Sequence, residues 1–357
     1  MNKLKSVLTA KNIGTGYLYF YIHFVVEVLC FYTLANVIGN SIFLWIVPFM
    51  YDAFAFVPQA LIGYISDKYP KINIGIIGTI LLIIGLITCN LHILGYISLI
   101  ILCLGNCCLH ISGAETTLRS SNGKLSHSAI FVAGGSFGVI TGKLLGTLNI
   151  SFWFLALLGL TMIPFILLAN EYKKEADKNK QPCKNFNYIN KKINPFIIIL
   201  LAVFVVIVRG YMGYGIPTSW NKTIIQTILL YVAMGTGKAL GGILSDWIGI
   251  RKTAIISILV ALPFLLFGDN NMFISLIGVL MFSMTMSITL AILVSVLKNK
   301  PGLAFGLTTI GLFLGTVPIF FIKLSFLYNC LVIGIFSIIC LIIMLIILRK
   351  DEVKWKI

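Results

Sequence analysis

Charged residues are scarce in this chain, and their scarcity limits what kind of protein it can be. Only 11% of the 357 residues are charged, whereas 59% are hydrophobic and the mean hydropathy is +1.02. A soluble globular domain carries roughly 25% charged residues. This composition therefore excludes a water-soluble protein, and the apolar segments leave no room for a soluble catalytic domain.

Three motifs that would indicate other functions are also missing. There is no Gly-Lys-Ser/Thr phosphate-binding loop, which excludes a self-contained pump driven by ATP. The eight cysteines form no Cys-x-x-Cys pair, and Cys103, Cys107 and His110 have no second ligand pair, so we expect no disulfide framework, metal or other cofactor. No Ser/His/Asp arrangement occurs at usable spacing, so we expect no enzymatic activity.

Acidic residues are fewer than basic ones, 11 against 27, which gives a net charge of +16. Most of the basic residues lie in the two tails and in alternate connections between apolar segments. This distribution follows the positive-inside rule and predicts a multi-pass protein of the cytoplasmic (plasma) membrane with both termini in the cytoplasm. We expect contact with the lipid bilayer and none with nucleic acid. The lysines before Gly14 lead into a full-length span, so we expect that span to be retained rather than cleaved.

Runs of about 20 apolar residues, the length that crosses a bilayer, occur along the whole chain. A lysine-rich polar stretch separates the sixth run from the seventh. The predicted organisation is a six-helix bundle over residues 1–170, a cytoplasmic basic linker over 171–195 that is a solvated tether, and a second six-helix bundle over 196–357. The twelve predicted spans are 17–38, 42–66, 72–89, 91–117, 128–148, 151–170, 196–216, 223–245, 253–268, 271–296, 302–322 and 325–348.

One short phrase occurs twice, about half a chain apart. The segment ALIGYISD at residues 60–67 recurs as ALGGILSD at residues 239–246, and each copy closes an apolar run. Such a repeat indicates two homologous membrane halves, the usual architecture of alternating-access transporters. Glycines recur as well, and they let helices approach closely, either for packing or as a sliding surface between the halves. The glycines in question are Gly134, Gly138, Gly142, Gly146, Gly311 and Gly315.

The loops at the two repeats carry a recognisable pattern. They read Gly63-x-x-x-Asp67-Lys68-x-x-Lys71 and Gly242-x-x-x-Asp246-x-x-Gly249-x-Arg251-Lys252. Two such loops at equivalent places resemble the signature loop of the major facilitator superfamily. The resemblance covers the whole chain and implies an all-α membrane fold of twelve transmembrane helices in two pseudo-symmetric bundles.

The same resemblance implies a role for these loops. In that family the loop residues latch the two halves together on the cytoplasmic side, so Asp67 and Asp246 are the expected latch, completed by Glu115 and Arg119. Simple capping of short loops is the alternative. The chain also resembles bacterial fosmidomycin-resistance exporters, through the acid of the first span, Arg-Gly-Tyr at 209–211 and Gly-Lys-Ala-Leu-Gly-Gly at 237–242.

Ionisable residues inside a membrane span are costly, so each needs a partner, water or a function. His23 and Glu27 lie four residues apart on one helix face and are proton-coupling candidates, unless they are a purely structural pair. Asp52 is another, unless it pairs with Lys143 or Arg209. Arg209 either holds a carboxylate or phosphate substrate or neutralises Glu27. The other candidates for the substrate cavity are His110, Asn106, Lys143, Lys238 and Tyr19.

These observations predict a secondary active transporter that moves a small-molecule substrate by alternating access, with protons as the driving ion and a single chain as the working unit. The basic residues inside the spans favour uptake of an organic anion or zwitterion. The likeness to exporters favours the alternative of proton-driven efflux of drugs or toxic compounds, although the fifth span lacks the Gly-Pro that is usual in drug antiporters. A non-transporting receptor or scaffold on the same fold is a further alternative.

Overall fold

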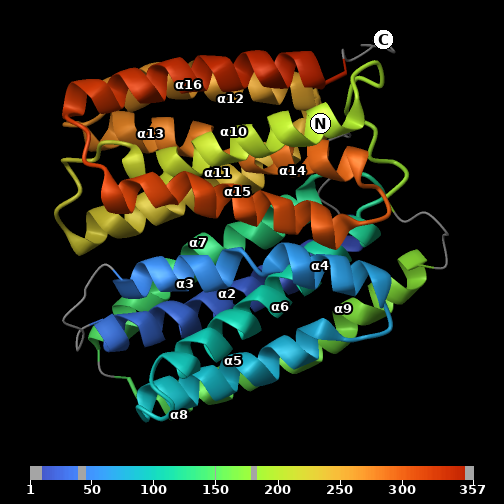
Figure 1. Ribbon diagram of the computed structural model, residues 1–357, viewed down its shortest axis with the longest axis vertical. Coiled ribbons are helices and arrows are strands. Elements are labelled where there is room, and N and C mark those ends of the chain that lie inside the picture. The colour runs from blue at the N-terminus through green and yellow to red at the C-terminus, as the bar shows by residue number, and fades with distance from the viewer. Residues whose placement is uncertain (1–9, 39–45, 149, 178–182, 350–357) are drawn as a thin grey trace.

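The computed structural model describes residues 10–38, 46–148, 150–177 and 183–349, and these are almost entirely helical (Figure 1). The helices are α2 (Ala10–Ile38), α3 (Ile46–Phe56), α4 (Gln59–Lys68), α5 (Ile74–Asn90), α6 (Tyr96–Ser120), α7 (Ser126–Thr147), α8 (Phe152–Leu160), α9 (Met162–Asp177), α10 (Pro195–Gly215), α11 (Ile224–Ile248), α12 (Ile250–Phe267), α13 (Met272–Ser283), α14 (Thr285–Val296), α15 (Pro301–Phe321) and α16 (Phe326–Ile347).

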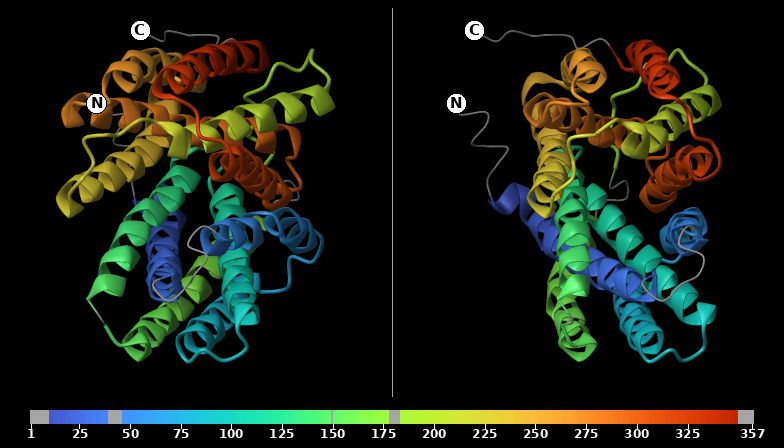
Figure 2. Two further views of the ribbon diagram at one scale, coloured as in Figure 1. Left: turned by 60° about the vertical axis from the view of Figure 1, so that its left-hand side comes forward. Right: turned by 90° about the vertical axis from the view of Figure 1, so that its left-hand side faces the viewer.

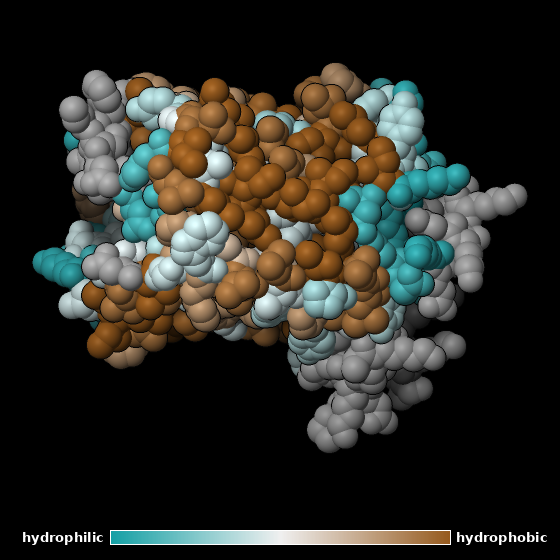
Figure 3. Space-filling model, turned by 90° about the horizontal axis from the view of Figure 1, so that it is seen from below, coloured by the Kyte–Doolittle hydropathy of each residue, from teal (hydrophilic) through white to brown (hydrophobic). Residues whose placement is uncertain are grey.

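The helices account for the twelve predicted spans. Eleven segments are long and apolar enough to cross a membrane, and α5 is a shorter apolar helix of 17 residues. Three of the eleven consist of two helices each, namely α3 with α4, α8 with α9, and α13 with α14. A brown apolar surface lies between more hydrophilic ends in Figure 3. The predicted all-helical, multi-pass membrane fold is confirmed, although residues 42–45 of the second span lie outside the described residues.

The break between α3 and α4 follows from Pro58. Proline has no N–H, so the carbonyl four residues earlier loses its helical donor. That carbonyl belongs to Phe54, and the thiol of Cys107 on α6 is shared between it, at 3.3 Å, and the carbonyl oxygen of Ala55, at 3.0 Å. A buried carbonyl without a partner would cost about 1–3 kcal/mol, so Cys107 stabilises the break.

The helices form two groups. Helices α2–α9 lie in the lower part of Figure 1 and α10–α16 in the upper part, and the two further views agree (Figure 2). The groups meet mainly along α7 and α11 and along α4 and α15. Any site between the groups is therefore lined by these four helices and their neighbours.

The predicted packing glycines lie within each group rather than between the groups. A Cβ at Gly138 would lie 2.4 Å from the carbonyl oxygen of Phe24 on α2, and a Cβ at Gly315 would lie 2.0 Å from that of Ile207 on α10. Only glycine permits such an approach. The contacts that these glycines make in this structure are packing contacts within each group. The others also face their own group: Gly134, Gly142, Gly146 and Gly311.

The predicted linker is packed over part of its length. Residues 178–182 lie outside the described residues, but Cys183 and Phe186 are both 0% exposed. The hydroxyl of Tyr188 donates to the carbonyl oxygen of Gly123 in the first group at 2.6 Å, and the backbone N–H of Tyr188 donates to the hydroxyl of Ser295 in the second group at 3.3 Å. The expectation of a solvated tether is therefore wrong for this part, because its apolar side chains fill the space where the two groups meet.

Candidate functional site

Asp67, near the end of α4, lies against the N-terminus of α15 in the other group. Its carboxylate accepts hydrogen bonds from the backbone N–H groups of Gly302 at 3.1 Å and Leu303 at 2.9 Å, and Arg119 Nη2 lies 3.4 Å away. These N–H groups have no partner inside their own helix and form the positive end of its dipole. The close approach requires Gly63, because a Cβ there would lie 2.3 Å from the carbonyl oxygen of Gly302.

Asp246 makes the same contact in the opposite direction. It lies near the end of α11, and its carboxylate accepts hydrogen bonds from the N–H groups of Leu125 at 2.8 Å and Ser126 at 2.9 Å, at the N-terminus of α7. A Cβ at Gly242 would lie 2.3 Å from that of Ala129. Each group therefore caps a helix of the other. We call the end of the molecule that holds Asp67 and Asp246 the inner end.

Glu115 and Arg119 extend the contact at Asp67 into the first group. Arg119 Nε lies 2.9 Å from Glu115 Oε1, and Lys173 Nζ lies 3.1 Å from the same oxygen. The hydroxyl of Ser66 donates to Glu115 Oε2 at 2.5 Å. Lys173, on α9, belongs to this network although nothing in its lysine-rich sequence context distinguishes it from its neighbours.

The remaining loop residues do not gather around the two aspartates. Gly249 has φ +98°, a left-handed conformation that suits glycine, and it forms the turn between α11 and α12. Arg251 donates to the carbonyl oxygens of Leu345 at 2.9 Å and Leu348 at 3.0 Å, at the C-terminus of α16. Three further basic residues are exposed: Lys68, Lys71 and Lys252.

Apolar contacts join the two groups at the opposite, outer end. The ring of Phe49 on α3 lies 5.8 Å from that of Phe313 and 5.3 Å from that of Phe320, both on α15, between ring centroids. These separations are typical of favourable aromatic pairs. The two groups thus touch both at the inner and at the outer end.

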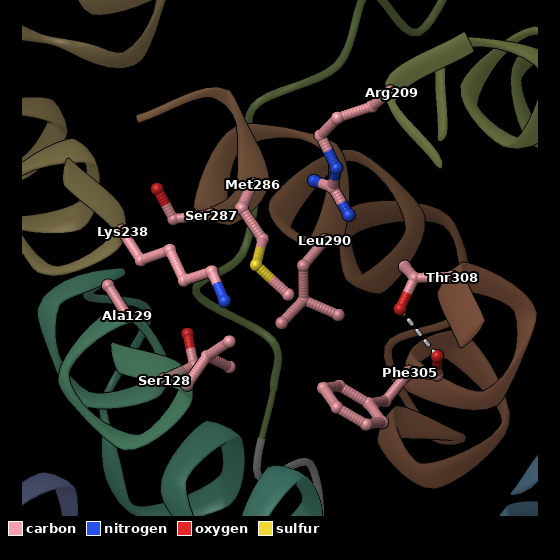
Figure 4. A pocket seen from close by; sticks show the side chains of 10 residues that line it. Ser128, Ala129, Arg209, Lys238, Met286, Ser287, Leu290, Phe305 and Thr308 are labelled. Atoms are coloured by element: carbon pink, nitrogen blue, oxygen red, sulfur yellow. Dashed lines mark hydrogen bonds between the residues drawn. The ribbon is translucent and has the colours of Figure 1, made fainter. Parts of the chain in front are cut away.

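A small pocket lies between the groups, lined by residues of both (Figure 4). Arg209 of α10 and Lys238 of α11 point toward it, as Figure 4 shows. Arg209 is 8% exposed, and its Nη1 donates to the hydroxyl of Thr289 at 3.0 Å, whereas Lys238 Nζ donates to the hydroxyl of Ser136 on α7 at 2.8 Å. The rest of the lining combines hydroxyl groups with apolar side chains: Ser128, Ser287, Thr308, Ala129, Val132, Met286, Leu290 and Phe305.

Neither cation of the pocket has an acidic partner within the described residues. Arg209 does not neutralise Glu27 in this structure. The neighbours of Glu27 Oε1 are His23, His110 and Asn106. The guanidinium of Arg209, on α10, donates instead to the hydroxyl of Thr289 on α14, in the same group. The hydroxyls that hold the two cations were not predicted, since serine and threonine carry no charge that distinguishes them within an apolar helix.

Glu27 forms a buried cluster with two histidines. His23 Nε2 lies 3.6 Å and His110 Nε2 lies 3.4 Å from Glu27 Oε1, and all three residues are 7% exposed. Asn106 Nδ2 lies 3.3 Å from the same oxygen and 3.1 Å from the hydroxyl of Tyr51. The spacing of His23 and Glu27 predicted that they would be neighbours. That His110 of α6 joins them depends on how α2 and α6 pack, which the spacing does not specify.

The other predicted cavity residues lie elsewhere. Tyr19 is 0% exposed and its hydroxyl lies 2.7 Å from that of Ser112, so it does not reach the pocket. Lys143 Nζ donates to the hydroxyl of Tyr231 at 2.9 Å. Asp52 is buried but forms no ion pair with Lys143 or Arg209, against the pairing considered from sequence. A long side chain can reach any partner within several ångströms. Which partners lie that close depends on how each helix is rotated about its axis, which the sequence spacing does not specify.

The described residues thus hold two inverted helix caps between the groups, a pocket between the groups and a buried carboxylate. Solved structures agree with this fold. The E. coli fucose:proton symporter FucP is similar over 94% of this chain and 98% of that chain, with a TM-score of 0.61 and 14% sequence identity. The human organic anion transporter MFSD10 is similar over the same shares, with a TM-score of 0.58 and 11% identity.

The chain therefore has the fold of the major facilitator transporters, which confirms the fold that the two loops implied. No protein-family model and no curated protein matches its sequence. Neither of these two structures is a fosmidomycin-resistance exporter, and that closer resemblance stays a prediction.

Proposed function

We propose that this protein is a secondary transporter that moves a small organic anion across the membrane by alternating access, driven by protons. The observation that carries the proposal is the central pocket, where Arg209 and Lys238 face one space without an acidic partner in the described residues. A charge inside the membrane costs at least a few kcal/mol unless it is compensated. An anion that enters the pocket compensates both cations.

The lining supports a carboxylate or phosphate attached to a small apolar body. A guanidinium presents two parallel donors that fit such groups. The hydroxyls of Ser128, Ser287 and Thr308 donate to backbone carbonyls three residues earlier, and each can rotate to donate to a bound anion instead. Phe305 and Met286 provide an apolar wall. MFSD10, one of the similar structures, is an organic anion transporter by name, which supports the same class.

The contacts at the two ends support alternating access. Opening the inner end requires the helix caps at Asp67 and Asp246 to break, because each joins the two halves. Opening the outer end requires Phe49 to leave the aromatic rings of α15. We propose that Asp67 and Asp246, with Glu115 and Arg119, latch the inner end while the substrate exchanges at the outer end.

The cluster at Glu27 is the proposed site of the coupling proton. His23 Nδ1 and His110 Nδ1 each lie 3.0 Å from a backbone carbonyl oxygen, which only accepts, so each Nδ1 carries the hydrogen. A neutral imidazole then presents a lone pair on Nε2 toward the carboxylate. A proton shared between these acceptors stabilises the cluster. The ring of His110 lies 6.4 Å from that of Phe305, between ring centroids, and Phe305 lines the pocket, so the proposed proton site adjoins the anion pocket.

We further propose that the two groups of helices are the predicted bundles and that the inner end faces the cytoplasm. Both chain termini and residues 171–195 then lie on the cytoplasmic side of the plasma membrane. The distribution of basic residues supports this orientation, and the packed linker segment lies at the same end as the two latch contacts.

Uptake into proteoliposomes tests the proposed substrate class. The purified protein is reconstituted and screened with radiolabelled small carboxylates, organic phosphates, neutral sugars and organic cations. We expect saturable transport of an anion, reduced at least tenfold by Arg209→Gln and by Lys238→Gln, because each removes a charge from the pocket. Lys222→Gln, which removes an exposed lysine outside the pocket, is the matched control and should transport normally. Transport restricted to neutral or cationic solutes would contradict the proposal.

A further inference from the structure

Three ligand-type atoms converge in the first half of the protein. His23 Nε2, His110 Nε2 and a carboxylate oxygen of Glu27 all lie within 4.8 Å of one another. They come from α2 and α6, two helices that pack together. The sequence did not predict a metal site because the histidines are far apart in the chain and only one of them lies near cysteines.

The hydrogen bonds of the two imidazoles are those of metal ligands. His23 Nδ1 bonds to the carbonyl oxygen of Phe131 and His110 Nδ1 to that of Asn106, both at 3.0 Å. A metal-binding histidine almost always donates its other ring N–H to a carbonyl or carboxylate, which fixes the tautomer and the orientation of the ring. Both Nε2 lone pairs are therefore directed toward Glu27.

The distances fit a tetrahedral ion. Two ligand atoms that each lie about 2.0–2.1 Å from Zn²⁺ at a tetrahedral angle are roughly 3.3–3.4 Å apart. The corresponding distances here are 3.6 Å from His23 Nε2 to Glu27 Oε1 and 3.4 Å from His110 Nε2 to the same oxygen. Two edges of the tetrahedron are thus almost at their final length, and the third, between the two Nε2 atoms, is no longer than 4.8 Å.

A fourth ligand is available beside the three. Asn106 is 1% exposed, and its Oδ1 has no hydrogen-bond partner within the described residues. Its Nδ2 lies 3.3 Å from Glu27 Oε1, so a half-turn of the amide brings the oxygen to the position of the nitrogen. The amide orientation is assigned from the hydrogen-bond network. A bound cation would favour the turned amide, since it gives the buried oxygen a partner.

We propose that His23, Glu27 and His110, with Asn106 as the fourth ligand, form a binding site for a divalent transition metal ion such as Zn²⁺. A set of two imidazoles and one carboxylate suits such ions, whereas Mg²⁺ and Ca²⁺ prefer oxygen ligands alone. The metal occupies the space that the coupling proton takes in the proposed transport function, so the ion inhibits proton-driven transport. Binding itself does not depend on that function.

Zn²⁺ binding to the purified full chain in detergent tests the site without any transport measurement. Isothermal titration and competition with a chromophoric chelator measure stoichiometry and affinity. We expect one equivalent of Zn²⁺, with affinity reduced at least tenfold by Glu27→Gln and by His110→Asn, a variant that keeps a donor toward the carbonyl of residue 106 but loses Nε2. His92→Gln removes a histidine outside the cluster and should bind as the unmodified protein does.

Thermal unfolding of the same samples reports whether the variants fold. An ion that binds only the folded state stabilises that state. Zn²⁺ should therefore raise the unfolding temperature of the unmodified protein and of His92→Gln. It should raise the unfolding temperature of Glu27→Gln much less. The proposal is overturned if the folded protein binds no Zn²⁺ saturably, or if folded Glu27→Gln and His110→Asn bind it as tightly as the unmodified chain. Either result leaves the anion-transport proposal intact, and failure to transport anions leaves Zn²⁺ binding intact.

Discussion

Arg209 and Lys238 differ in what they contribute to the central pocket. Arg209 is held by one hydrogen bond from Nη1 to Thr289, which leaves most of its five donors free to meet a ligand. Lys238 is held by Ser136, a residue of the other half, so its position depends on how the halves are arranged. We therefore propose that the guanidinium selects the shape of the substrate, and that the position of the ammonium changes when the halves move.

Substitution of Arg209 by lysine tests this division of roles. The variant keeps the charge but loses the planar pair of donors, and hydrogen bonds to charged groups contribute about 1.5–3 kcal/mol each. We expect Arg209→Lys to weaken binding of the transported anion at least tenfold, measured as the concentration for half-maximal uptake. Equal affinity in Arg209→Lys would mean that the guanidinium does not hold the substrate.

Glu27 is the residue on which proton coupling depends in the proposed function. Its neutral analogue, Glu27→Gln, keeps the size of the side chain but does not exchange a proton. We expect this variant to lose accumulation of the anion against its gradient and to retain exchange of internal for external anion, since the latter needs no net proton movement. Counterflow and uptake assays in proteoliposomes measure both activities.

The matched control for Glu27 is Glu171→Gln, which removes an exposed carboxylate on α9 that pairs with Lys174. This variant should accumulate the anion normally. If Glu27→Gln still concentrates the anion with unchanged pH dependence, the proton site lies elsewhere, and Asp52→Asn is then the variant to test.

The inner and outer closures differ in physical character at the level of helices. The inner end is held by carboxylates at the N-termini of α7 and α15, and the outer end by aromatic contacts between α3 and α15. A charge at a helix N-terminus contributes about 0.3–1 kcal/mol, and up to about 2 kcal/mol when partly buried. Two such contacts shift an equilibrium between states without locking either one.

We therefore expect Asp246→Asn to favour opening of the inner end. The loss of about 1 kcal/mol corresponds to roughly fivefold in the equilibrium, and transport should fall because closure of the inner end becomes less stable. Labelling of a Ser287→Cys pocket reporter from the inner side measures the change. The control is Asp269→Asn, which alters a carboxylate that accepts a hydrogen bond from the backbone N–H of Ser219. Unchanged labelling and transport in both Asp246→Asn and Asp67→Asn would contradict the latch.

Much of the element-level structure was predictable, and the reasons are local. Apolar runs of the right length fixed the spans, and the repeated Gly-x-x-x-Asp phrase placed Asp67 and Asp246 at equivalent helix ends. The partners of charged side chains were not predictable in the same way. Whether Arg209 meets Glu27 or Thr289, and whether His110 reaches Glu27, depends on helix rotation and tilt, which arise from the packing of many apolar side chains together.

At the scale of the whole molecule, the orientation in the membrane is a separate prediction. Lys191 is exposed in the packed part of the linker, and the native cysteines other than Cys330 are buried. A cysteine at this position, Lys191→Cys, should resist impermeant thiol reagents added to intact cells and react after the membrane is opened. Labelling of Lys191→Cys in intact cells beyond that of the unmodified protein, whose Cys330 is partly exposed, would contradict the proposed orientation.

The central claim is that anion movement and proton movement are coupled in one protein. Proteoliposomes that hold the purified chain and a pH-sensitive dye allow both to be followed when an anion gradient is imposed at zero pH gradient. The account predicts that the anion gradient alone drives a pH change in the lumen, absent in Glu27→Gln vesicles. Anion flux with no accompanying proton flux in the unmodified protein would contradict it.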